Sequence, residues 1–241
     1  IDRAHSKGLQ QIGKRKKNTI TSSERILTAN RLFMIDELKK IRKKCKKILI
    51  ALLYAASKFQ KVPFKRSTLG HFLLGITESL MDDMDLLDFA GAHINKNPLG
   101  SVDGYGSIHL LPRELTTQEL GFKKIQINSL YCRYSSVKFT NLYLNTLAQI
   151  SESLRKLNTQ FSSQKQKKRI RKIPQGNTIK NASAIMSENL QSAKTILKNL
   201  IRKIRNSEIP KTLDPKFKTI ISLGAAGNLD LDYYRTRLGK I

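Results

Sequence analysis

The chain has 241 residues, with 45 Lys or Arg against 18 Asp or Glu, which gives a formal net charge of +27. Because 39% of the residues are hydrophobic, the chain can bury a core, so general disorder is excluded, and the length allows one or two domains. Such a charge favours polyanions as partners. A composition rich in Lys, Ile and Asn also arises by codon drift in an A/T-rich genome, so charge alone does not decide the function.

Residues 1–20 are polar and basic and lack the apolar core of a signal peptide. The chain begins at Ile1 instead of Met, which leaves open a processed or incomplete chain, and we expect residues 1–20 to be a remnant of a longer N-terminal region. Cys45 and Cys132 lie far apart without a CxxC pattern. Neither a disulfide framework nor a cysteine metal site is therefore predicted, and a reducing cytoplasm is the expected location.

Four segments carry apolar residues three and four positions apart, the spacing that places them on one face of a helix. The first predicted helix starts near Ser22 or Ser23, where a hydroxyl can cap it, and ends before Pro63. Its apolar stretch over residues 48–56 is too short to span a bilayer. The four apolar lines are Leu38, Ile41, Cys45, Ile48, Leu52, Ala55 and Phe59; Leu69, Leu73, Ile76, Leu80, Met84, Leu87, Gly91 and Ile94; Tyr143, Leu147, Ile150, Leu154, Leu157 and Phe161; and Leu190, Ala193, Leu197, Leu200 and Ile204.

The connections between these helices differ in character. Residues 97–107 are rich in glycine and predict a structured loop with positive φ angles, whereas residues 162–172 form a charge run that predicts a mobile loop. No alternating strand pattern of useful length is present, so little β structure is expected. We predict an all-α protein with a central helical bundle over residues 21–207, packed at shallow crossing angles, and a remnant of a C-terminal region over residues 208–241.

Three segments in the middle of the chain resemble argininosuccinate lyase, of the all-helical fumarase/aspartase superfamily. Residues 79–87, 97–107 and 111–122 are similar to that family's ESLLDDLELL, NPLGSAAGYGS and LDREMTTELLGF segments, in order and in spacing. Weaker similarity covers residues 12–29 and 223–229. The resemblance implies the long-helix bundle of that superfamily with truncated N- and C-terminal parts, because this chain is far shorter than the family's enzymes.

The resemblance also implies a reaction. The family eliminates fumarate from argininosuccinate to give arginine, in arginine biosynthesis. A base removes a proton beside a carboxylate, the carbanion is stabilised electrostatically, and an acid protonates the departing guanidino nitrogen. The implied substrate is thus argininosuccinate, with no cofactor, and the implied assembly is a homo-oligomer, a tetramer whose subunits meet at the active sites.

The resemblance assigns the catalytic serine to Ser183. The family's mobile loop GSSIMPQKKN is similar to residues 182–191, so Ser183 is the predicted base. The loop lysine that stabilises the carbanion has become Asn189, and the asparagine beyond it Gln191. A competing register would place Ser162 and the lysines after it on that loop. It ranks lower because the family's proline-containing approach to the loop resembles residues 173–175, which must precede the serines.

Two further parts of the family's site are altered. The substrate-binding SRND segment aligns with residues 21–24, where serines replace its Arg and Asn and only Glu24 keeps an acidic character. The PGYTHMQ segment, which carries an active-site histidine after a Val-Pro pair, is absent, and none of His71, His93 and His109 takes its place. The sequence therefore predicts an argininosuccinate lyase homologue with impaired catalysis.

Other interpretations stay open from the residues alone. Ser183 is otherwise a loop serine or a helix N-cap, and Arg133 and Lys138 belong either to the active site or to a solvated face. The acidic residues Glu78, Asp82 and Asp85 share a helix face with the spacing of a divalent-metal site, although pairing with the lysine-rich first helix explains them with less. The scattered histidines show no ligand spacing, and no metal site is predicted.

The alternative function is a non-catalytic basic helical remnant or a polyanion- or RNA-binding protein. Lysine and arginine runs at residues 14–17, 39–47 and 164–172 would contact phosphates with a steep salt dependence. No aromatic stacking pattern or nucleic-acid-binding signature accompanies them, so non-specific polyanion binding is the expected form of this interaction. No membrane association is predicted.

Overall fold

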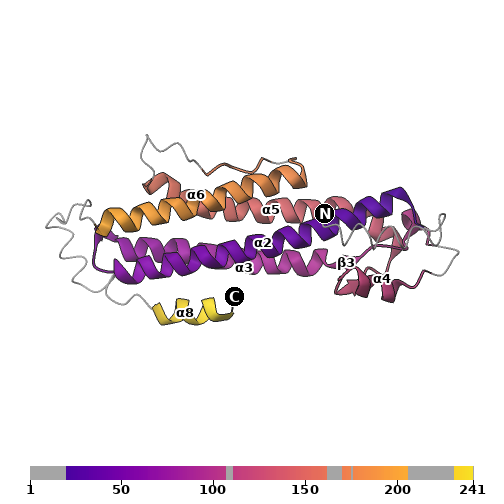
Figure 1. Ribbon diagram of the computed structural model, residues 1–241, viewed down its shortest axis with the longest axis horizontal. Coiled ribbons are helices and arrows are strands. Elements are labelled where there is room, and N and C mark those ends of the chain that lie inside the picture. The colour runs from indigo at the N-terminus through magenta and orange to yellow at the C-terminus, as the bar shows by residue number, and fades with distance from the viewer. Residues whose placement is uncertain (1–19, 107–110, 162–169, 175, 206–230, 241) are drawn as a thin grey trace. The chain divides into compact units, whose positions relative to one another are not determined.

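The computed structural model describes residues 20–106, 111–161, 170–174, 176–205 and 231–240. In this part of the chain the long elements are the helices α2 (Ser22–Lys58), α3 (Leu69–Ile94), α5 (Ser129–Phe161) and α6 (Ile179–Arg205) (Figure 1). The shorter α4 (Arg113–Glu119) lies between α3 and α5 in the chain, and the shorter α8 (Leu231–Lys240) follows α6. The strands are two residues each: β1 (Pro63–Phe64), β2 (Ser67–Thr68), β3 (Lys96–Asn97) and β4 (Lys124–Ile125). The predicted all-α fold with little β structure is confirmed. Among the described helices, none has the length and hydropathy needed to cross a membrane.

The first two helices lie close to their predicted bounds, whereas α5 and α6 begin at Ser129 and Ile179, well before Tyr143 and Leu190, where their predicted apolar lines start. The cap of α2 differs by one residue. The Glu24 amide donates to Thr21 Oγ1 at 3.3 Å, and the Thr21 amide donates to Glu24 Oε2 at 3.1 Å. This reciprocal pair is a capping box, so Thr21 caps the helix instead of Ser22 or Ser23. The reason is that only Thr21 has an acid three residues later.

The four apolar lines are the core-facing stripes of α2, α3, α5 and α6. Apart from Gly91 and Phe161, which are partly exposed, every described side chain on these lines is buried, and Leu200 and Ile204 lie outside the residues whose side chains are described. Spacing of three and four residues therefore identified the buried faces correctly, because it follows the 3.6-residue turn of the helix.

The chain divides into two compact units. Unit 1 comprises Ile1–Lys40 and Leu87–Asn145, and unit 2 comprises Ile41–Leu86 and Thr146–Ile241, so α2, α3 and α5 contribute residues to both. Unit 1 also holds α4 and the parallel pair β3–β4; unit 2 also holds the antiparallel pair β1–β2, α6 and α8. The expected remnants at residues 1–20 and 208–241 fall largely outside the described residues, so those boundaries stay predictions.

In unit 2, α8 covers the acidic face of α3. Arg237 Nη2 donates to Asp82 Oδ1 at 2.7 Å and to Asp85 Oδ2 at 2.8 Å, and the Tyr234 hydroxyl donates to Glu78 Oε2 at 3.0 Å. The expectation that these acids pair with the lysine-rich first helix is wrong. Their partners lie on α8, more than 150 residues further along the chain, where no sequence spacing connects them.

Asp83, beside this face, points into the core of unit 2. Its side chain is 9% exposed and its Oδ2 has no hydrogen-bond partner among the described atoms. Burial raises the pKa of Asp83, and the neighbouring Asp82 carboxylate raises it further, while a hydrogen bond with Ser153 and the charge of Lys156 oppose the rise. The same buried carboxyl contributes, after burial itself, to raising the pKa of the Cys45 thiol to about 12.

Because its pKa is raised, Asp83 makes the free energy of unfolding depend on pH. In unfolded chains Asp83 loses its proton near the ordinary pKa of 3.8, whereas in the folded state it does so at higher pH, so stability falls as pH rises through that window. We expect Asp83→Asn to increase the free energy of unfolding by about 1 kcal/mol at neutral pH, with the gain vanishing below the ordinary Asp pKa. Urea denaturation of both proteins, at neutral pH and at a pH below the ordinary Asp pKa, measures this gain in the free energy of unfolding. A gain that is the same at both would contradict an ionisation effect.

Candidate functional site

In unit 1, Glu24 joins the start of α2 to the glycine-rich loop. Its side chain is 2% exposed, and its Oε1 accepts hydrogen bonds from the Ser101 hydroxyl at 3.1 Å and the Val102 amide at 2.7 Å. Its Oε2 belongs to the capping box with Thr21. Glu24, the residue that keeps the acidic character of the substrate-binding segment, therefore uses both carboxylate oxygens to hold the protein's own backbone.

The loop that Glu24 holds has the conformation that its glycines predict. Gly100 and Gly104 have φ angles of 89° and 105°, and a Cβ on Gly104 would lie 3.0 Å from Leu130 Cδ1. Val102 adopts φ 42° without being glycine, in the turn η1 (Val102–Gly104). Because a left-handed β-branched residue is strained, the hydrogen bond from its amide to Glu24 is needed to keep it there.

Two of the segments that resemble argininosuccinate lyase form one hydrogen-bonded network. Asn97 Nδ2 donates to the hydroxyls of Thr116 at 3.0 Å and Thr117 at 2.9 Å, and its Oδ1 accepts the Leu99 amide at 3.0 Å. Arg113 Nε donates to the Leu99 carbonyl at 2.9 Å, and its Nη2 donates to the Gln126 carbonyl at 2.7 Å. These side chains therefore fix the path of the loop against α4 and β4.

Arg31 is a buried cation that the sequence interpretation missed. It is 0% exposed, donates to the Lys96 carbonyl at 2.6 Å and to Ser135 Oγ at 2.7 Å, and lies 4.9 Å from the ring centre of Phe139. Burial lowers the pKa of Arg31 to about 10, and its Nε has no hydrogen-bond partner among the described atoms. Extending the apolar line of the first helix backwards from Leu38 reaches Arg31, and this signal would have found it.

A small pocket of about 270 Å³ lies beside Glu24 in unit 1. Arg133, for which the sequence left an active-site role open, lines it, whereas the Lys138 ammonium lies over the ring of Tyr131 at 5.7 Å. The pocket offers one guanidinium and several hydroxyls beside the Glu24 carboxylate, which suit a small polar molecule that both donates and accepts hydrogen bonds. Its lining residues are Ser23, Glu24, Ile26, Leu27, Asn30, Ser101, Arg133 and Ser136.

In unit 2, the segment that carries Ser183 is helical. Residues 182–191 lie within α6, and Ser183 is 6% exposed, so the loop that the resemblance implies for this segment is a helix here, and the loop-serine and N-cap interpretations of Ser183 are wrong. Relative to the family's GSSIMPQKKN, the glycine is replaced by Ala182 and the proline by Ser187, which removes both helix breakers. Ala182, Met186 and Leu190 then continue the buried stripe of α6 without interruption.

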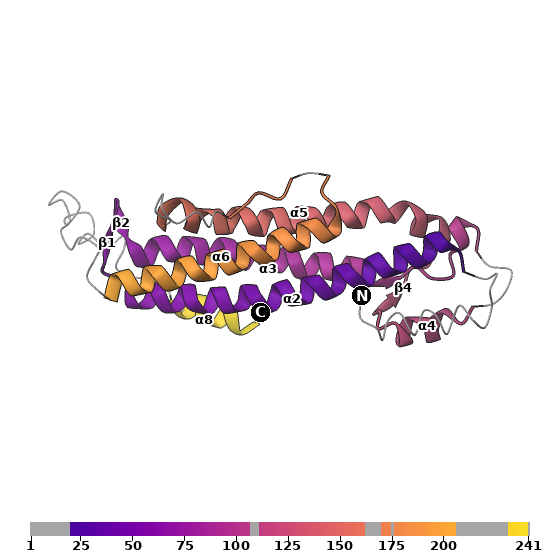
Figure 2. The ribbon, with the colours of Figure 1, turned by 45° about the horizontal axis from the view of Figure 1, so that its top comes forward.

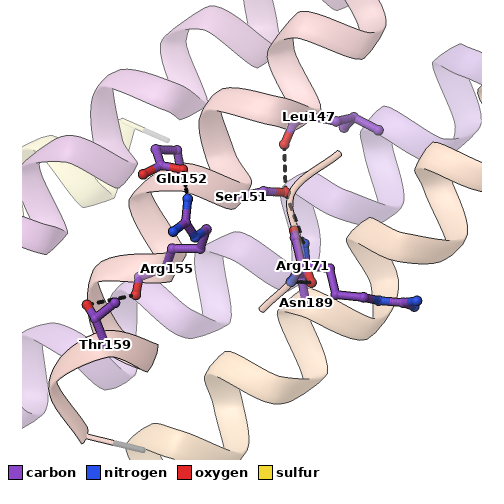
Figure 3. Close-up of polar contacts among 7 residues, drawn as sticks. All are labelled: Leu147, Ser151, Glu152, Arg155, Thr159, Arg171 and Asn189. Atoms are coloured by element: carbon purple, nitrogen blue, oxygen red, sulfur yellow. Dashed lines mark hydrogen bonds and ion pairs between the residues drawn. The ribbon is translucent and has the colours of Figure 1, made fainter. Parts of the chain in front are cut away.

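Asn189, in the position of the family's stabilising lysine, is part of the protein's internal structure. It is 1% exposed; its Oδ1 accepts the Arg171 amide at 2.8 Å, and its Nδ2 donates to the Arg171 carbonyl at 2.8 Å and to Ser151 Oγ at 3.1 Å (Figure 3). Ser151 in turn donates to the Leu147 carbonyl at 2.9 Å. Beside this contact the Arg171 guanidinium pairs with Glu188. We name Asn189 with Arg171 and Ser151 the Asn189 clamp.

At the position where the family carries its histidine motif, a short hairpin leads into α3. Strands β1 and β2 pair through Pro63 with Thr68 and Phe64 with Ser67. The ring of Phe64 packs 5.0 Å from Phe72 and 5.6 Å from Phe161, measured between centroids. His71 is exposed, and its Nδ1 shares a hydrogen bond of 2.8 Å with Ser67 Oγ. The competing register at Ser162 falls outside the described residues.

Comparisons with known proteins relate part of the chain to argininosuccinate lyases. No protein-family model matches the chain. It is 32% identical over 157 residues to argininosuccinate lyase of Thermotoga neapolitana, and 29% identical over 158 residues to argininosuccinate lyase of Phocaeicola vulgatus. These matches cover 61% and 62% of this chain but only 39% and 35% of the relatives. The chain is thus related to argininosuccinate lyases while matching well under half of their length.

Solved structures show the fold. A structure of EDDS lyase in complex with formate superposes with a TM-score of 0.56 at 18% identity, covering 80% of this chain and 42% of that one. A variant of EDDS lyase with bound fumarate gives a TM-score of 0.58 at 16% identity, covering 88% of this chain and 52% of that one. The predicted long-helix bundle of the fumarase/aspartase type is confirmed at the level of fold.

Glu24 is expected to be essential for the stability of unit 1. Glu24→Ala removes the capping box and leaves the strained Val102 amide without its acceptor, so we expect the free energy of unfolding to fall by about 2 kcal/mol or more. Asp36→Ala on the same helix is the matched control, because Asp36 makes only an exposed ion pair with Lys39, worth about 1 kcal/mol at most. Equal losses in urea denaturation would contradict the role assigned to Glu24.

The Asn189 clamp predicts a local effect. Asn189→Ala leaves the partly buried amide and carbonyl of Arg171 without the Asn189 side chain, so we expect a loss of about 1 kcal/mol and faster hydrogen exchange in residues 170–173. Gln191→Ala, an exposed change on the same helix, is the control and should alter neither. Unchanged exchange in residues 170–173 of the Asn189 variant would show that the clamp does not hold that segment.

Proposed function

We propose that this protein is an argininosuccinate lyase homologue whose catalysis is impaired. The observation that carries the proposal is the Asn189 clamp, because the residue aligned with the family's carbanion-stabilising lysine is buried and its amide is committed to Arg171 and Ser151. A neutral, enclosed amide can supply no positive charge to a developing carbanion. Its geometry suits a structural role.

The other two requirements of the elimination are weakened as well. Ser183 remains the residue proposed as base, and as a buried serine on a continuous helix it would need a local opening of α6 to reach a substrate. In the described residues 61–70, where the resemblance places the family's histidine motif, the chain forms the β1–β2 hairpin and supplies no histidine as general acid. Loss of a positioned acid costs about 10² to 10⁴ in rate, and loss of a charge stabiliser costs about 10² to 10³.

The proposal keeps the remaining features that the relatives suggest. The substrate would be argininosuccinate, the assembly a homo-oligomer, and the location the cytoplasm. The pocket lined by Arg133 and Glu24 is the place in unit 1 that we propose for residual contact with polar groups of the substrate. No cofactor is part of the proposal. The alternative is a non-catalytic basic helical protein, which retains the fold and has no turnover.

Fumarate release from argininosuccinate, followed by ultraviolet absorbance, tests the proposal. We expect a rate at least about 10⁴-fold below that of the Thermotoga neapolitana enzyme in the same assay, since the losses of acid and stabiliser combine. A rate within about tenfold of that enzyme would contradict impairment.

Single-residue variants then distinguish a slow lyase from a non-catalytic helical protein. Ser183→Ala should abolish any residual release if the protein is a slow lyase, whereas Ser192→Ala, on the same helix and partly exposed, should leave it unchanged. Complete absence of release from the unmodified protein, with the fold confirmed by circular dichroism, would favour the non-catalytic alternative.

A further inference from the structure

A cleft of about 1140 Å³ runs between α2 and α6 in unit 2, and Figure 2 shows the two helices side by side there. We name it the α2–α6 groove. Its lining residues are Lys44, Lys47, Ile48, Ala51, Arg171, Ser187, Glu188, Leu190, Gln191, Ser192, Lys194, Leu197 and Lys198. Ser183 and Asn189 do not line it, whereas Ser187, Glu188, Leu190 and Gln191, from the same segment aligned with the lyase loop, do.

The groove combines an apolar floor with a cationic rim. Ala51, which is partly exposed, and the edges of Ile48, Leu190 and Leu197, which are only 2–3% exposed, form the floor. Exposed lysines stand on both sides, from α2 and from α6. The acid that lines the groove, Glu188, already pairs with Arg171. Within the described part of the chain, none of the rim lysines Lys44, Lys47, Lys194 and Lys198 forms an ion pair with a carboxylate; Lys44 instead donates to Ser187 Oγ at 2.7 Å.

The lining positions repeat with helical spacing. On α2 they are 44, 47, 48 and 51, and on α6 they are 187, 188, 190, 191, 192, 194, 197 and 198. Most of these positions have a neighbour three or four residues away, so each helix presents one broad face to the groove. From Ser187 to Lys198 the groove follows α6 for roughly 16 Å, about three helical turns. A trough of this form between two helices suits a third helix whose side chains interdigitate with both.

We propose that the α2–α6 groove binds an acidic amphipathic helix of a partner protein. Apolar residues of that helix, at three- and four-residue spacing, would cover Ala51 and the edges of Ile48, Leu190 and Leu197 in the floor. Asp or Glu residues flanking them would pair with the lysines of the rim, which relieves their mutual repulsion. This inference does not depend on the proposed lyase function.

Charge argues against two other kinds of occupant. Residues 1–19 and 162–169 of this chain are themselves strongly basic, and a second copy placed groove to groove would set lysines against lysines. Nucleic acid would satisfy the rim but not the floor, because single strands bind through stacking on aromatic side chains and none of the lining residues is aromatic. A helix with acidic and apolar residues meets both parts of the surface.

The test uses the full chain and a fluorescent synthetic helix as probe, about four turns long, with Leu at helical spacing flanked by Glu. Fluorescence anisotropy should show saturable binding. Lys194→Glu with Lys198→Glu should weaken it at least about tenfold, whereas Lys123→Glu with Lys124→Glu, the same charge change at exposed positions of unit 1, should weaken it less than about twofold. Lys44→Gln with Lys47→Gln repeats the rim test on α2 if the α6 variant loses helicity by circular dichroism.

The apolar floor is tested by one change in the probe and one change in the protein. Replacing every Leu of the probe by Ser should abolish binding, and Ala51→Gln, which places a longer polar side chain in the groove, should weaken it. Equal binding of the Leu-to-Ser probe would overturn the proposal, and so would equal losses in the two charge-reversed variants. If a uridine homopolymer displaces the probe from the rim lysines and Ala51→Gln has no effect, the groove is a polyanion site and the proposal fails.

Discussion

One face of α6 is buried without interruption, and this burial fixes where Ser183, Asn189 and the lysines of α6 lie in unit 2. Ala182, Met186, Leu190 and Ala193 are all buried along this face, and with no glycine or proline in Ile179–Arg205 nothing interrupts the helix. Because the segment is helical, Ser183 turns into the protein and Asn189 reaches Ser151 and the backbone of Arg171. Lys194 and Lys198 of the same helix line the α2–α6 groove, next to Leu190 and Leu197 of the buried face.

Unit 1 depends on buried polar groups that satisfy one another. Glu24, Asn97 and Arg113 bind backbone atoms of the loop between α3 and α4, and together they hold a strained residue, Val102, in place. Groups buried in this way are costly to leave unpaired, so each partner stabilises the others. The segments most similar to argininosuccinate lyase thus have a structural explanation in this chain, and their similarity does not by itself indicate catalysis.

Two carboxylates of α3 are paired within the chain, whereas the lysines that line the α2–α6 groove are not paired with carboxylates among the described residues. On α3, the carboxylates of Asp82 and Asp85 meet a cation, Arg237, within the same chain. On α2 and α6, lysines surround an apolar floor without such compensation among the described residues. The net charge of +27 is therefore not simply a solvated excess spread over helix faces, since part of it is concentrated where a complementary partner can bind.

The sequence by itself determined the long helices, their buried faces and the altered catalytic residues, because apolar spacing and residue identity are local properties. It also contained the signals for Arg31 and for the continuation of α6, had the apolar lines been extended past Leu38 and Leu190. Only the tertiary structure decided that Asn189 binds Arg171, that Glu24 binds Val102, and that α8 covers the acids of α3. Such contacts join residues far apart in the chain, and hydrogen bonds and ion pairs form only when packing brings their atoms within a few ångströms, a distance that no sequence spacing records.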